Sequence, residues 1–361
     1  MHRFSLAVAA MLFAATASFA ESDIDRLIEE TNIVPGPAAM RNIPSWDATR
    51  KIIVRNIGFE QSEFGDNVVL VSSLDEALEQ APEAGAIIGY CDKELIAAAP
   101  HLSWVQIYSA GAERCLASAP FSSNGIVLTN GQKMSSPMIG EHAIAMLLNL
   151  TRDLSQFSDD MEKGEWRRGS QYTDRMTTVS GKTMLVLGLG GIGTEVARRG
   201  AALGMRVTGT RNSSREGPEF VEYVGLADEM VSLAAEADVI VNALPLTDAT
   251  RGLLGAEFFT PDVLKRQPYF INVGRGATVD TDALLSALDS GVVAGAGLDV
   301  TDPEPLPADH PLWQSERVLI TPHISSRGSN RDRLQTLSRE NILRFLAGDA
   351  LFNVVDPDKG Y

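Results

Sequence analysis

The sequence predicts an α/β protein of two domains, each built on a parallel sheet. The chain has 361 residues, which is more than a single domain usually contains. Short apolar runs alternate with helical segments along most of its length, and this alternation is typical of parallel sheets. A glycine-rich turn follows one apolar run and opens a helical segment, which marks the start of a doubly wound sheet.

The first half is predicted to form a flavodoxin-like domain. Its expected strands are residues 51–54, 68–71, 86–89 and 105–108, with a helix over 73–80. A helical segment at 331–347 lies beyond all the predicted strands, so we expect it to return to this domain. The predicted domain is therefore discontinuous and comprises residues 21–132 and 325–361.

The second half is predicted to be a Rossmann domain over residues 133–324. Its expected sheet has about six strands, at residues 183–187, 206–209, 239–243, 269–273, 294–298 and 318–320. A helix at 137–150 precedes the sheet and is apolar on more than one face, so it needs cover on both sides. We therefore expect a homodimer, with the loop through Trp166 reaching across to the second copy.

Composition narrows the classes of partner. The net charge is −16, which argues against nucleic acid and anionic membranes as partners. The two cysteines, Cys91 and Cys115, have neither C-x-x-C nor metal-site spacing. We expect both to be free thiols, with a disulfide between them only if the protein is exported. No two histidines have ligand spacing, so no metal site is predicted.

The glycine-rich turn is the motif that predicts a ligand. It reads Gly188-Leu189-Gly190-Gly191-Ile192-Gly193, between an apolar run and a helical segment. In such a turn the first glycine bends the chain, the second lets a pyrophosphate approach and the third lets helix and strand pack closely. The helix N-terminus adds free N–H groups and a partial positive charge. The pattern predicts nucleotide binding, and the alternative is a glycine-rich turn without a ligand.

Three side chains follow later strands of the same predicted sheet: Arg275, Glu304 and His323. Ligands of open α/β sheets bind beyond the carboxyl ends of the strands, which is where the glycine turn also lies. An arginine can hold a carboxylate with two hydrogen bonds, a histidine can move a proton near neutral pH, and a glutamate can orient that histidine. Each residue alone is more often a surface or loop charge, but their joint placement predicts a catalytic set.

From about residue 52 to residue 361 the chain resembles the D-isomer-specific 2-hydroxyacid dehydrogenases, which include glyoxylate/hydroxypyruvate reductases. Besides the glycine turn, the resemblance rests on Leu244-Pro245-Leu246-Thr247, Asn272-Val273-Gly274-Arg275-Gly276, Gly297-Leu298-Asp299-Val300, Glu304-Pro305 and Thr321-Pro322-His323. It implies an enzyme that transfers a hydride between a nicotinamide cofactor and a 2-keto or 2-hydroxy acid, such as glyoxylate or hydroxypyruvate.

The resemblance also implies roles for particular residues. Arg275 would bind the substrate carboxylate and carbonyl, His323 would be the acid/base, and Glu304 would be its partner. The turn Ser109-Ala110-Gly111 would hold the substrate carboxylate through backbone N–H groups, although without the resemblance it reads as an ordinary turn. The implied cofactor-binding set is Gly188, Leu189, Gly190, Gly191, Ile192, Gly193, Thr210, Arg211, Asn212, Ser213, Leu244, Pro245, Val273, Gly274, Arg275, Asp299 (at the nicotinamide end) and His323.

The end of the second Rossmann strand bears on the choice of cofactor. NAD enzymes usually have an acidic residue there to bind the ribose 2′-OH, but this chain has Thr210 followed by Arg211. An arginine can pair with a 2′-phosphate, with help from Ser213 or Arg215, so the sequence favours NADP(H). The alternative is that Arg211 only stacks on the adenine and that NAD(H) binds as well.

Residues 1–20 have the three parts of a secretory signal peptide: a basic start, an apolar stretch at 4–13 and small residues at 18–20. The apolar stretch is too short to predict a membrane span, so no membrane association is expected for the mature protein. The expected location is secreted or periplasmic if this segment is a signal peptide, and cytoplasmic otherwise. Export raises a difficulty, since NADP(H) is a cytosolic cofactor.

The rival function is a non-enzymatic dinucleotide-binding sensor on the same fold.

Overall fold

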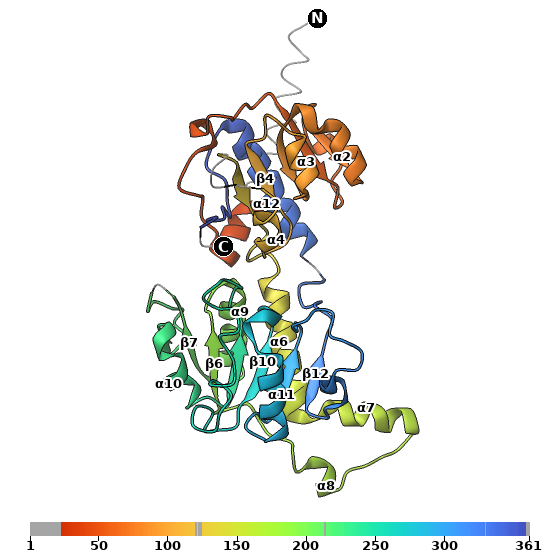
Figure 1. Cartoon of the computed structure of the whole chain (residues 1–361), viewed down its shortest axis with the longest axis vertical. Coiled ribbons are helices and arrows are strands. Elements are labelled where there is room, and N and C mark those ends of the chain that lie inside the picture. The colour runs from red at the N-terminus through yellow and green to blue at the C-terminus, as the bar shows by residue number, and fades with distance from the viewer. Residues whose placement is uncertain (1–22, 120, 122–124, 213, 329, 359–361) are drawn as a thin grey trace, which may run out of the picture. The chain divides into compact units, whose positions relative to one another are not determined.

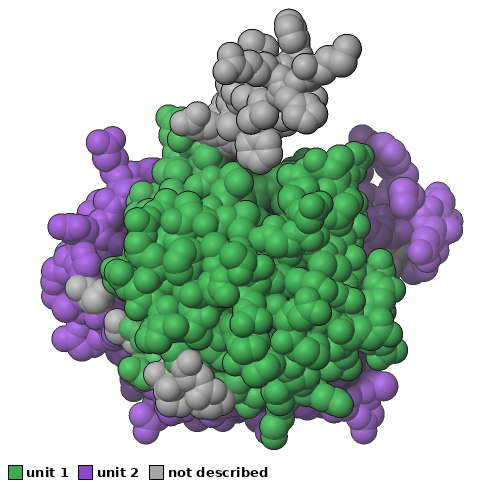
Figure 2. Space-filling view, turned by 90° about the horizontal axis from the view of Figure 1, so that it is seen from above, with its two compact units in different colours: residues 1–134, 328–361 green, residues 135–327 purple. Residues whose placement is uncertain are grey.

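The computed structural model describes residues 23–119, 121, 125–212, 214–328 and 330–358 (Figure 1). The expected signal peptide at 1–20 and the predicted cofactor residue Ser213 lie outside the described residues. The chain forms two compact units, which Figure 2 shows in different colours. Unit 1 comprises residues 1–134 and 328–361, and unit 2 comprises residues 135–327. The expected bounds at 132 and 325 lie two and three residues from these.

Unit 1 is built on a five-stranded sheet with the order β2-β1-β3-β4-β5, in which every neighbouring pair is parallel. This is the strand order of flavodoxin-like folds, as predicted. Its elements are η1 (Met40–Asn42), β1 (Lys51–Arg55), η2 (Gln61–Glu63), β2 (Val68–Val71), α2 (Leu74–Gln80), η3 (Ala81–Glu83), β3 (Ala84–Ile88), α3 (Lys93–Ala97), β4 (Trp104–Gln106), α4 (Glu113–Leu116), β5 (Val127–Thr129) and α12 (Arg331–Ala347). Strand β5, which has three residues, was not predicted.

Alternating side chains of β1 face two separate cores of unit 1. Ile52 packs in the same cluster as Ile342 and Phe345 of α12. The next residue, Ile53, points to the opposite face of the sheet and belongs to the cluster that contains residues of α2, α3 and α4. The ring of Trp104 stacks on Phe345 with centroids 5.4 Å apart. The C-terminal helix α12 therefore covers one face of the sheet and the short helices cover the other.

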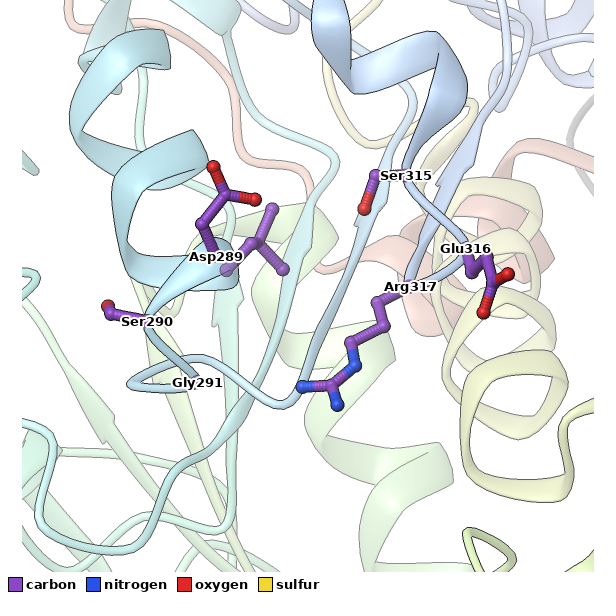
Figure 3. Close-up of a pocket in the computed structure, with 7 residues that line it drawn as sticks. Asp289, Ser290, Gly291, Ser315, Glu316 and Arg317 are labelled. Atoms are coloured by element: carbon purple, nitrogen blue, oxygen red, sulfur yellow. The ribbon is translucent and has the colours of Figure 1, made fainter. Parts of the chain in front are cut away.

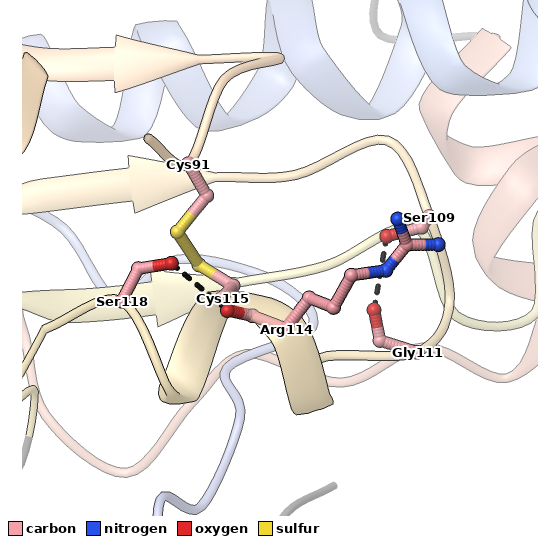
Figure 4. The surroundings of a disulfide bond; sticks show 6 residues. All are labelled: Cys91, Ser109, Gly111, Arg114, Cys115 and Ser118. Atoms are coloured by element: carbon pink, nitrogen blue, oxygen red, sulfur yellow. Dashed lines mark hydrogen bonds between the residues drawn. A yellow bond between two sulfur atoms is a disulfide. The ribbon is translucent and has the colours of Figure 1, made fainter. Parts of the chain in front are cut away.

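A disulfide joins Cys91 to Cys115 in unit 1, with the two Cα atoms 5.4 Å apart (Figure 4). The expectation that both cysteines are free thiols was wrong. Cys91 follows β3, and Cys115 lies in α4, which follows the neighbouring strand β4. Because parallel neighbours end at the same edge of a sheet, the segments that follow them start close together. The 24-residue separation of the two cysteines hides this proximity in the sequence.

Unit 2 contains a seven-stranded parallel sheet with the order β12-β11-β10-β9-β6-β7-β8. Counted from β6, this is the doubly wound order of dinucleotide-binding folds with one further strand. Its elements are α6 (Ser136–Arg152), α7 (Leu154–Lys163), α8 (Ser170–Thr173), β6 (Thr183–Leu187), α9 (Gly191–Ala202), β7 (Arg206–Thr210), β8 (Tyr223–Gly225), η4 (Ala227–Glu229), α10 (Met230–Ala234), β9 (Val239–Asn242), β10 (Tyr269–Asn272), η5 (Gly276–Thr278), α11 (Thr281–Asp289), β11 (Gly295–Leu298), η6 (Pro311–Gln314) and β12 (Val318–Ile320). The predicted six strands omitted β8, which has only three residues.

The central strands of unit 2 are buried on both faces, as β6 shows. Met184 and Val186 of β6 share a core with residues of α6 and α9. Leu185 and Leu187 point to the opposite face and share a core with residues of α11. The sheet is therefore a middle layer between helices, and its strand ends are the places where loops can build a site.

Helix α6 finds its cover within a single chain. It packs against α9 and against β10 and β11, and Ile144, Met146 and Leu147 are buried there. The second copy that we predicted is therefore not needed to cover this helix. Large apolar side chains are exposed farther along instead, where Met161 of α7 is 78% exposed and Trp166 is 91% exposed. Figure 1 shows α7 and α8 projecting away from the sheet of unit 2.

Among the helices that the structure describes, none combines the length and the apolar character that a membrane crossing requires.

Candidate active site

The glycine turn between β6 and α9 has the geometry of an anion-binding loop. Gly188 has φ +88°, in the left-handed region that favours glycine. A Cβ atom on Gly193 would lie 2.1 Å from the carbonyl oxygen of Gly188, so only glycine permits this close packing. A Cβ atom on Gly190 would meet no described atom within 4 Å. The backbone at the N-terminus of α9 is thus open, and this opening fits the pyrophosphate of a dinucleotide.

Two loops pack beside the turn, one after β9 and one after β10. A Cβ atom on Gly188 would lie 3.1 Å from the carbonyl oxygen of Ala243, and one on Gly274 would lie 2.8 Å from that of Leu244. Backbones can approach this closely only where one of the two residues has no Cβ atom, as glycine does. The structure therefore brings the glycine turn together with both predicted cofactor segments, Leu244–Pro245 and Val273–Gly274.

Thr210 supports the turn from the end of β7. It is 5% exposed, and its hydroxyl accepts a hydrogen bond from the backbone N–H of Gly188 at 3.2 Å. Its carbonyl oxygen accepts from the N–H of Leu189 at 2.9 Å. These two bonds hold the turn against β7, so the structure gives Thr210 a supporting role beside its predicted place in the cofactor site.

Arg211 and Arg215 differ in what they contact. The Nε atom of Arg211 is buried and has no hydrogen-bond partner among the described residues. Arg215 pairs with Glu229 and donates to the hydroxyl of Tyr223 at 2.9 Å. The Tyr223 hydroxyl also donates to Glu229, and this bond is the main cause that lowers the pKa of the Glu229 carboxyl. A bound anion would satisfy Arg211, whereas Arg215 is already engaged. Asn212 is exposed in the same loop.

Glu304 and His323 form the central pair of the site. The Nδ1 atom of His323 lies 2.6 Å from Oε1 of Glu304. Both side chains are 43% exposed, so a ligand can reach them. Because a carboxylate only accepts hydrogen bonds, Nδ1 carries the proton between them. The opposite nitrogen, Nε2, is therefore the one positioned to exchange a proton with a ligand.

The loop that carries His323 is fastened to Asp299, which follows β11. The Asp299 carboxylate accepts from the Thr321 hydroxyl at 2.6 Å and from the backbone N–H groups of Ile324 and Ser325 at 2.9 and 3.0 Å. Burial raises the pKa of Asp299, but hydrogen bonds from Ser325, Thr321 and the main chain outweigh it and lower the pKa overall. Asp299 is only 1% exposed. The contact between Asp299 and the nicotinamide, which the resemblance implies, stays a prediction. The small exposed part of Asp299 would have to make that contact.

Arg275 lies at the same edge of the sheet. It is the residue before η5, is half-buried, and donates from Nη1 to the carbonyl oxygen of Gly274 at 2.9 Å. Strands β10, β11 and β12 are consecutive neighbours in the sheet. Arg275, Asp299 and His323 therefore follow the carboxyl ends of three adjacent strands.

The predicted carboxylate-binding turn, Ser109–Gly111, belongs to unit 1. The Ser109 hydroxyl donates to the carbonyl oxygen of Gly111 at 2.9 Å, and the Asn130 amide donates to that of Ala110 at 2.7 Å. Cys115 of the disulfide lies four residues after Gly111, in α4, and Figure 4 shows Arg114 pointing from α4 toward Ser109. The turn has a fixed shape with a cation directed toward it.

A separate hollow on unit 2 lies at the opposite edge of the sheet. Its lining residues, shown in Figure 3, are Leu288, Asp289, Ser290, Gly291, Ser315, Glu316 and Arg317. They end α11 and precede β12, so the hollow is at the amino end of β12 and away from His323.

Within the described part of the chain, no three metal-binding side chains of the His, Cys, Asp or Glu type lie together.

Comparison with known proteins identifies the family. The model of the D-isomer specific 2-hydroxyacid dehydrogenase NAD-binding domain matches residues 144–325. The chain is 32% identical over 271 residues to glyoxylate/hydroxypyruvate reductase B of Pectobacterium carotovorum, covering 74% of this chain and 83% of that protein. The chain belongs to the D-isomer-specific 2-hydroxyacid dehydrogenase family.

Two further comparisons agree with this family. An uncharacterized protein of Corynebacterium melassecola is 41% identical over 184 residues, which cover 50% of this chain and 59% of that protein. The structure is similar to an NADPH-dependent glyoxylate/hydroxypyruvate reductase from Sinorhizobium meliloti, solved with NADP and sulfate. The TM-score is 0.73 at 26% identity, covering 86% of this chain and 100% of that one.

As a 2-hydroxyacid dehydrogenase, the chain is an oxidoreductase that uses a nicotinamide cofactor and acts on the CH–OH group of a 2-hydroxy acid. The predicted family and fold class are confirmed, and the rival function as a non-enzymatic sensor is not supported.

Sequence reasoning missed two side chains: Arg114 beside the Ser109–Gly111 turn of unit 1, and His142 beside the loop that carries His323 in unit 2. Arg114 was passed over because its direction depends on α4. His142 was assigned no role, yet its Nε2 atom lies 2.9 Å from Oγ1 of Thr321 and 3.6 Å from Oδ1 of Asp299. His142 and Thr321 are 179 positions apart in the sequence, so no sequence signal points to this contact.

Proposed function

We propose that this enzyme reduces a small 2-keto acid, such as glyoxylate or hydroxypyruvate, with NADPH as the hydride donor. The observation that carries the proposal is the hydrogen-bonded pair of Glu304 and His323, at the same sheet edge as the glycine turn. The relatives from Pectobacterium and Sinorhizobium, which are glyoxylate/hydroxypyruvate reductases by name, support this class of substrate.

The chain's own residues would supply binding and proton transfer. When bound, the reduced nicotinamide supplies the hydride that adds to the keto carbon. His323 donates the proton on Nε2 to the keto oxygen, which completes the hydroxyl group of the product. Glu304 holds Nδ1–H and stabilises the charged imidazole before this transfer. Arg275 binds the substrate carboxylate and polarises the keto oxygen, so charge that develops on that oxygen is stabilised. Oxidation of the hydroxy acid runs through the same groups in reverse.

The turn Ser109–Gly111 is proposed as the second holder of the substrate carboxylate. Its shape is fixed by the bonds from Ser109 and Asn130, and Arg114 points toward it (Figure 4). Backbone N–H groups in a fixed turn, with a cation nearby, favour a small anion.

The preference for NADPH is supported by the end of β7. Arg211 stands in this loop with a buried Nε that has no partner among the described residues, and the position before it is Thr210 rather than a carboxylate. Arginine and phosphate form charged hydrogen bonds of matched geometry. The related Sinorhizobium enzyme is NADPH-dependent.

The function is tested by steady-state kinetics on purified protein with glyoxylate, hydroxypyruvate and phenylpyruvate, each with NADPH and NADH. We expect turnover of a small keto acid with NADPH, and no turnover of any of them would refute the proposal. His323→Ala should lower kcat by about 10²- to 10⁴-fold with little change in NADPH affinity. His310→Ala is the matched control, since the His310 side chain caps the start of η6 by accepting a hydrogen bond from the Leu312 N–H.

We also propose that the protein is exported to the periplasm or the medium. Residues 1–20 have the pattern of a signal peptide, and a disulfide joins the cysteines. These two observations are independent of each other. N-terminal sequencing of protein from the producing cells should find a start near residue 21, and alkylation before reduction should leave Cys91 and Cys115 unlabelled. An intact N-terminus with both thiols labelled would place the protein in the cytoplasm.

We propose a homodimer whose contact includes the exposed apolar side chains of α7 and the segment after it. Met161 and Trp166 are 78% and 91% exposed, and removing this apolar area from water favours association. A second copy of the same segment, related by a two-fold axis, would cover them. Light scattering at micromolar concentration should give the mass of a dimer, and Trp166→Asp should shift it toward that of a monomer. A monomeric wild-type protein would contradict the proposal.

A further inference from the structure

We propose that His142, Thr321 and Asp299 act as a brace that positions His323 for proton transfer. The inference rests on the proposed catalytic role of His323. The three residues come from separate elements of unit 2: α6, the loop after β12 and the loop after β11. They are positioning residues, because they act on the loop that carries His323 rather than on the substrate.

The hydrogen bonds of the brace have a defined direction. The Thr321 hydroxyl has one proton, and it donates that proton to Oδ1 of Asp299 at 2.6 Å, because an ionised carboxylate cannot donate. The pKa of Asp299 is lowered, which favours this ionised form. Nε2 of His142, 2.9 Å from the same hydroxyl, must therefore be the donor in that contact. The order of donation runs from His142 to Thr321 to Asp299.

Asp299 in turn holds the backbone on both sides of His323. Its carbonyl oxygen accepts from the N–H of His323 at 2.8 Å. Its carboxylate accepts from the next two backbone N–H groups, those of Ile324 and Ser325. His323 has φ +51°, in the left-handed region that residues other than glycine rarely adopt. A conformation of this kind persists only where the surroundings enforce it, and the bonds to Asp299 do so here.

Helix α6 gives the brace a rigid end. It is a 17-residue helix that packs against α9 and against β10 and β11. His142 lies on this helix with its side chain 23% exposed, while the Asp299 side chain is 1% exposed. The contact from His142 fixes the Thr321 hydroxyl, and through it the orientation of the Asp299 carboxylate. A small rotation of that carboxylate would shift His323 away from Glu304, and proton transfer is sensitive to shifts of this size.

The test is a double-mutant cycle that links Thr321 to His323. Thr321→Val keeps the shape of the side chain and removes the hydroxyl. We expect it to lower kcat about ten- to a hundredfold, with the KM for keto acid and the Kd for NADPH changed less than about twofold. In the His323→Ala background the same substitution should change kcat less than about twofold, because no histidine is left to position. Thr260→Val, at a threonine far along the chain from this loop, is the matched control.

A second pair of variants tests the end of the brace on α6. His142→Gln keeps an N–H donor on a side chain of similar reach, and His142→Phe removes it. We expect kcat to fall about tenfold in the Phe variant and to recover most of that loss in the Gln variant, with NADPH binding unchanged in both. If Thr321→Val fails to bind NADPH, this pair carries the test alone, because it leaves the loop's own hydroxyl in place.

The possible failures separate the inference from the proposed function. An equal loss of kcat from Thr321→Val in both backgrounds would show a general structural role and overturn the brace. Equal kcat values for His142→Phe and His142→Gln would also overturn it. If His323→Ala alone leaves kcat unchanged, the proposed function fails at its catalytic residue, and the brace fails with it.

Discussion

Arg211 offers the sharpest test of how this enzyme selects its cofactor. Replacing it with alanine should weaken the use of NADPH and leave the use of NADH nearly unchanged. A charged hydrogen bond contributes about 1.5–3 kcal/mol, which corresponds to roughly a ten- to hundredfold change in kcat/KM. Arg215 should not compensate, because it would first have to leave Glu229 and the Tyr223 hydroxyl. The expected loss is therefore that of one arginine acting alone.

The assay measures initial rates with NADPH and NADH at fixed keto acid, for wild type, Arg211→Ala and Arg215→Ala. Arg215→Ala removes the same charge from the same loop, so it is the matched control, and we expect it to change the NADPH/NADH ratio less than about threefold. Thr210→Asp combined with Arg211→Ala should reverse the ratio, because a carboxylate can bind the free 2′-OH and repels a 2′-phosphate. A wild-type enzyme that uses NADH as well as NADPH, or equal losses in the two alanine variants, would refute this reasoning.

Three further predictions follow from other parts of the molecule. Replacing Cys91 and Cys115 with alanine opens a link that spans 24 residues, for which chain entropy gives a loss of about 3.5 kcal/mol in the free energy of unfolding. Urea unfolding with and without reductant measures it, and a loss below about 1 kcal/mol would contradict the estimate from loop length. Asp299 has a pKa below 3.8 in the folded state, so its contribution to stability is present above that value and is lost as the pH falls through the lower folded pKa. Urea unfolding at a series of acidic pH values should show this loss in wild type and a smaller one in Asp299→Asn. Arg275→Lys should raise KM and lower kcat together, since an ammonium cannot form two parallel bonds to a carboxylate, and near-native kinetics would remove Arg275 from the site.

Most strands of the Rossmann sheet were predictable because, as in β6, β9 and β10, they are largely apolar runs that are buried in the sheet. Strand β6 and the glycine turn after it show why, since buried parallel strands need no polar side and the turn needs glycine for steric reasons. The two strands that escaped prediction, β5 and β8, have three residues each. Strands β4 and β12 are equally short and were predicted, so at this length a sequence pattern identifies some strands and misses others.

The site was predictable where a residue's role follows from its place after a strand. Glu304 and His323 are an example, because the carboxyl ends of neighbouring parallel strands share an edge. The contacts of His142 and the pairing of Cys91 with Cys115 were not predictable in the same way. Each of these two contacts joins segments that come together only when the helices pack on the sheet. A sequence pattern does not predict this packing or the direction of a side chain.

The discontinuity of unit 1 has a consequence for the order in which the protein is made. Unit 2 is a single stretch of 193 residues, 135–327, inserted between the two parts of unit 1. During synthesis, the chain can therefore complete the sheet of unit 2 while one face of the unit 1 sheet is not yet covered by α12. Until the last helix is synthesised, the face of β4 that carries Trp104 has no Phe345 to stack on. Unit 1 therefore cannot complete its core until unit 2 has been synthesised, and for that interval it exposes the apolar surface that α12 later covers.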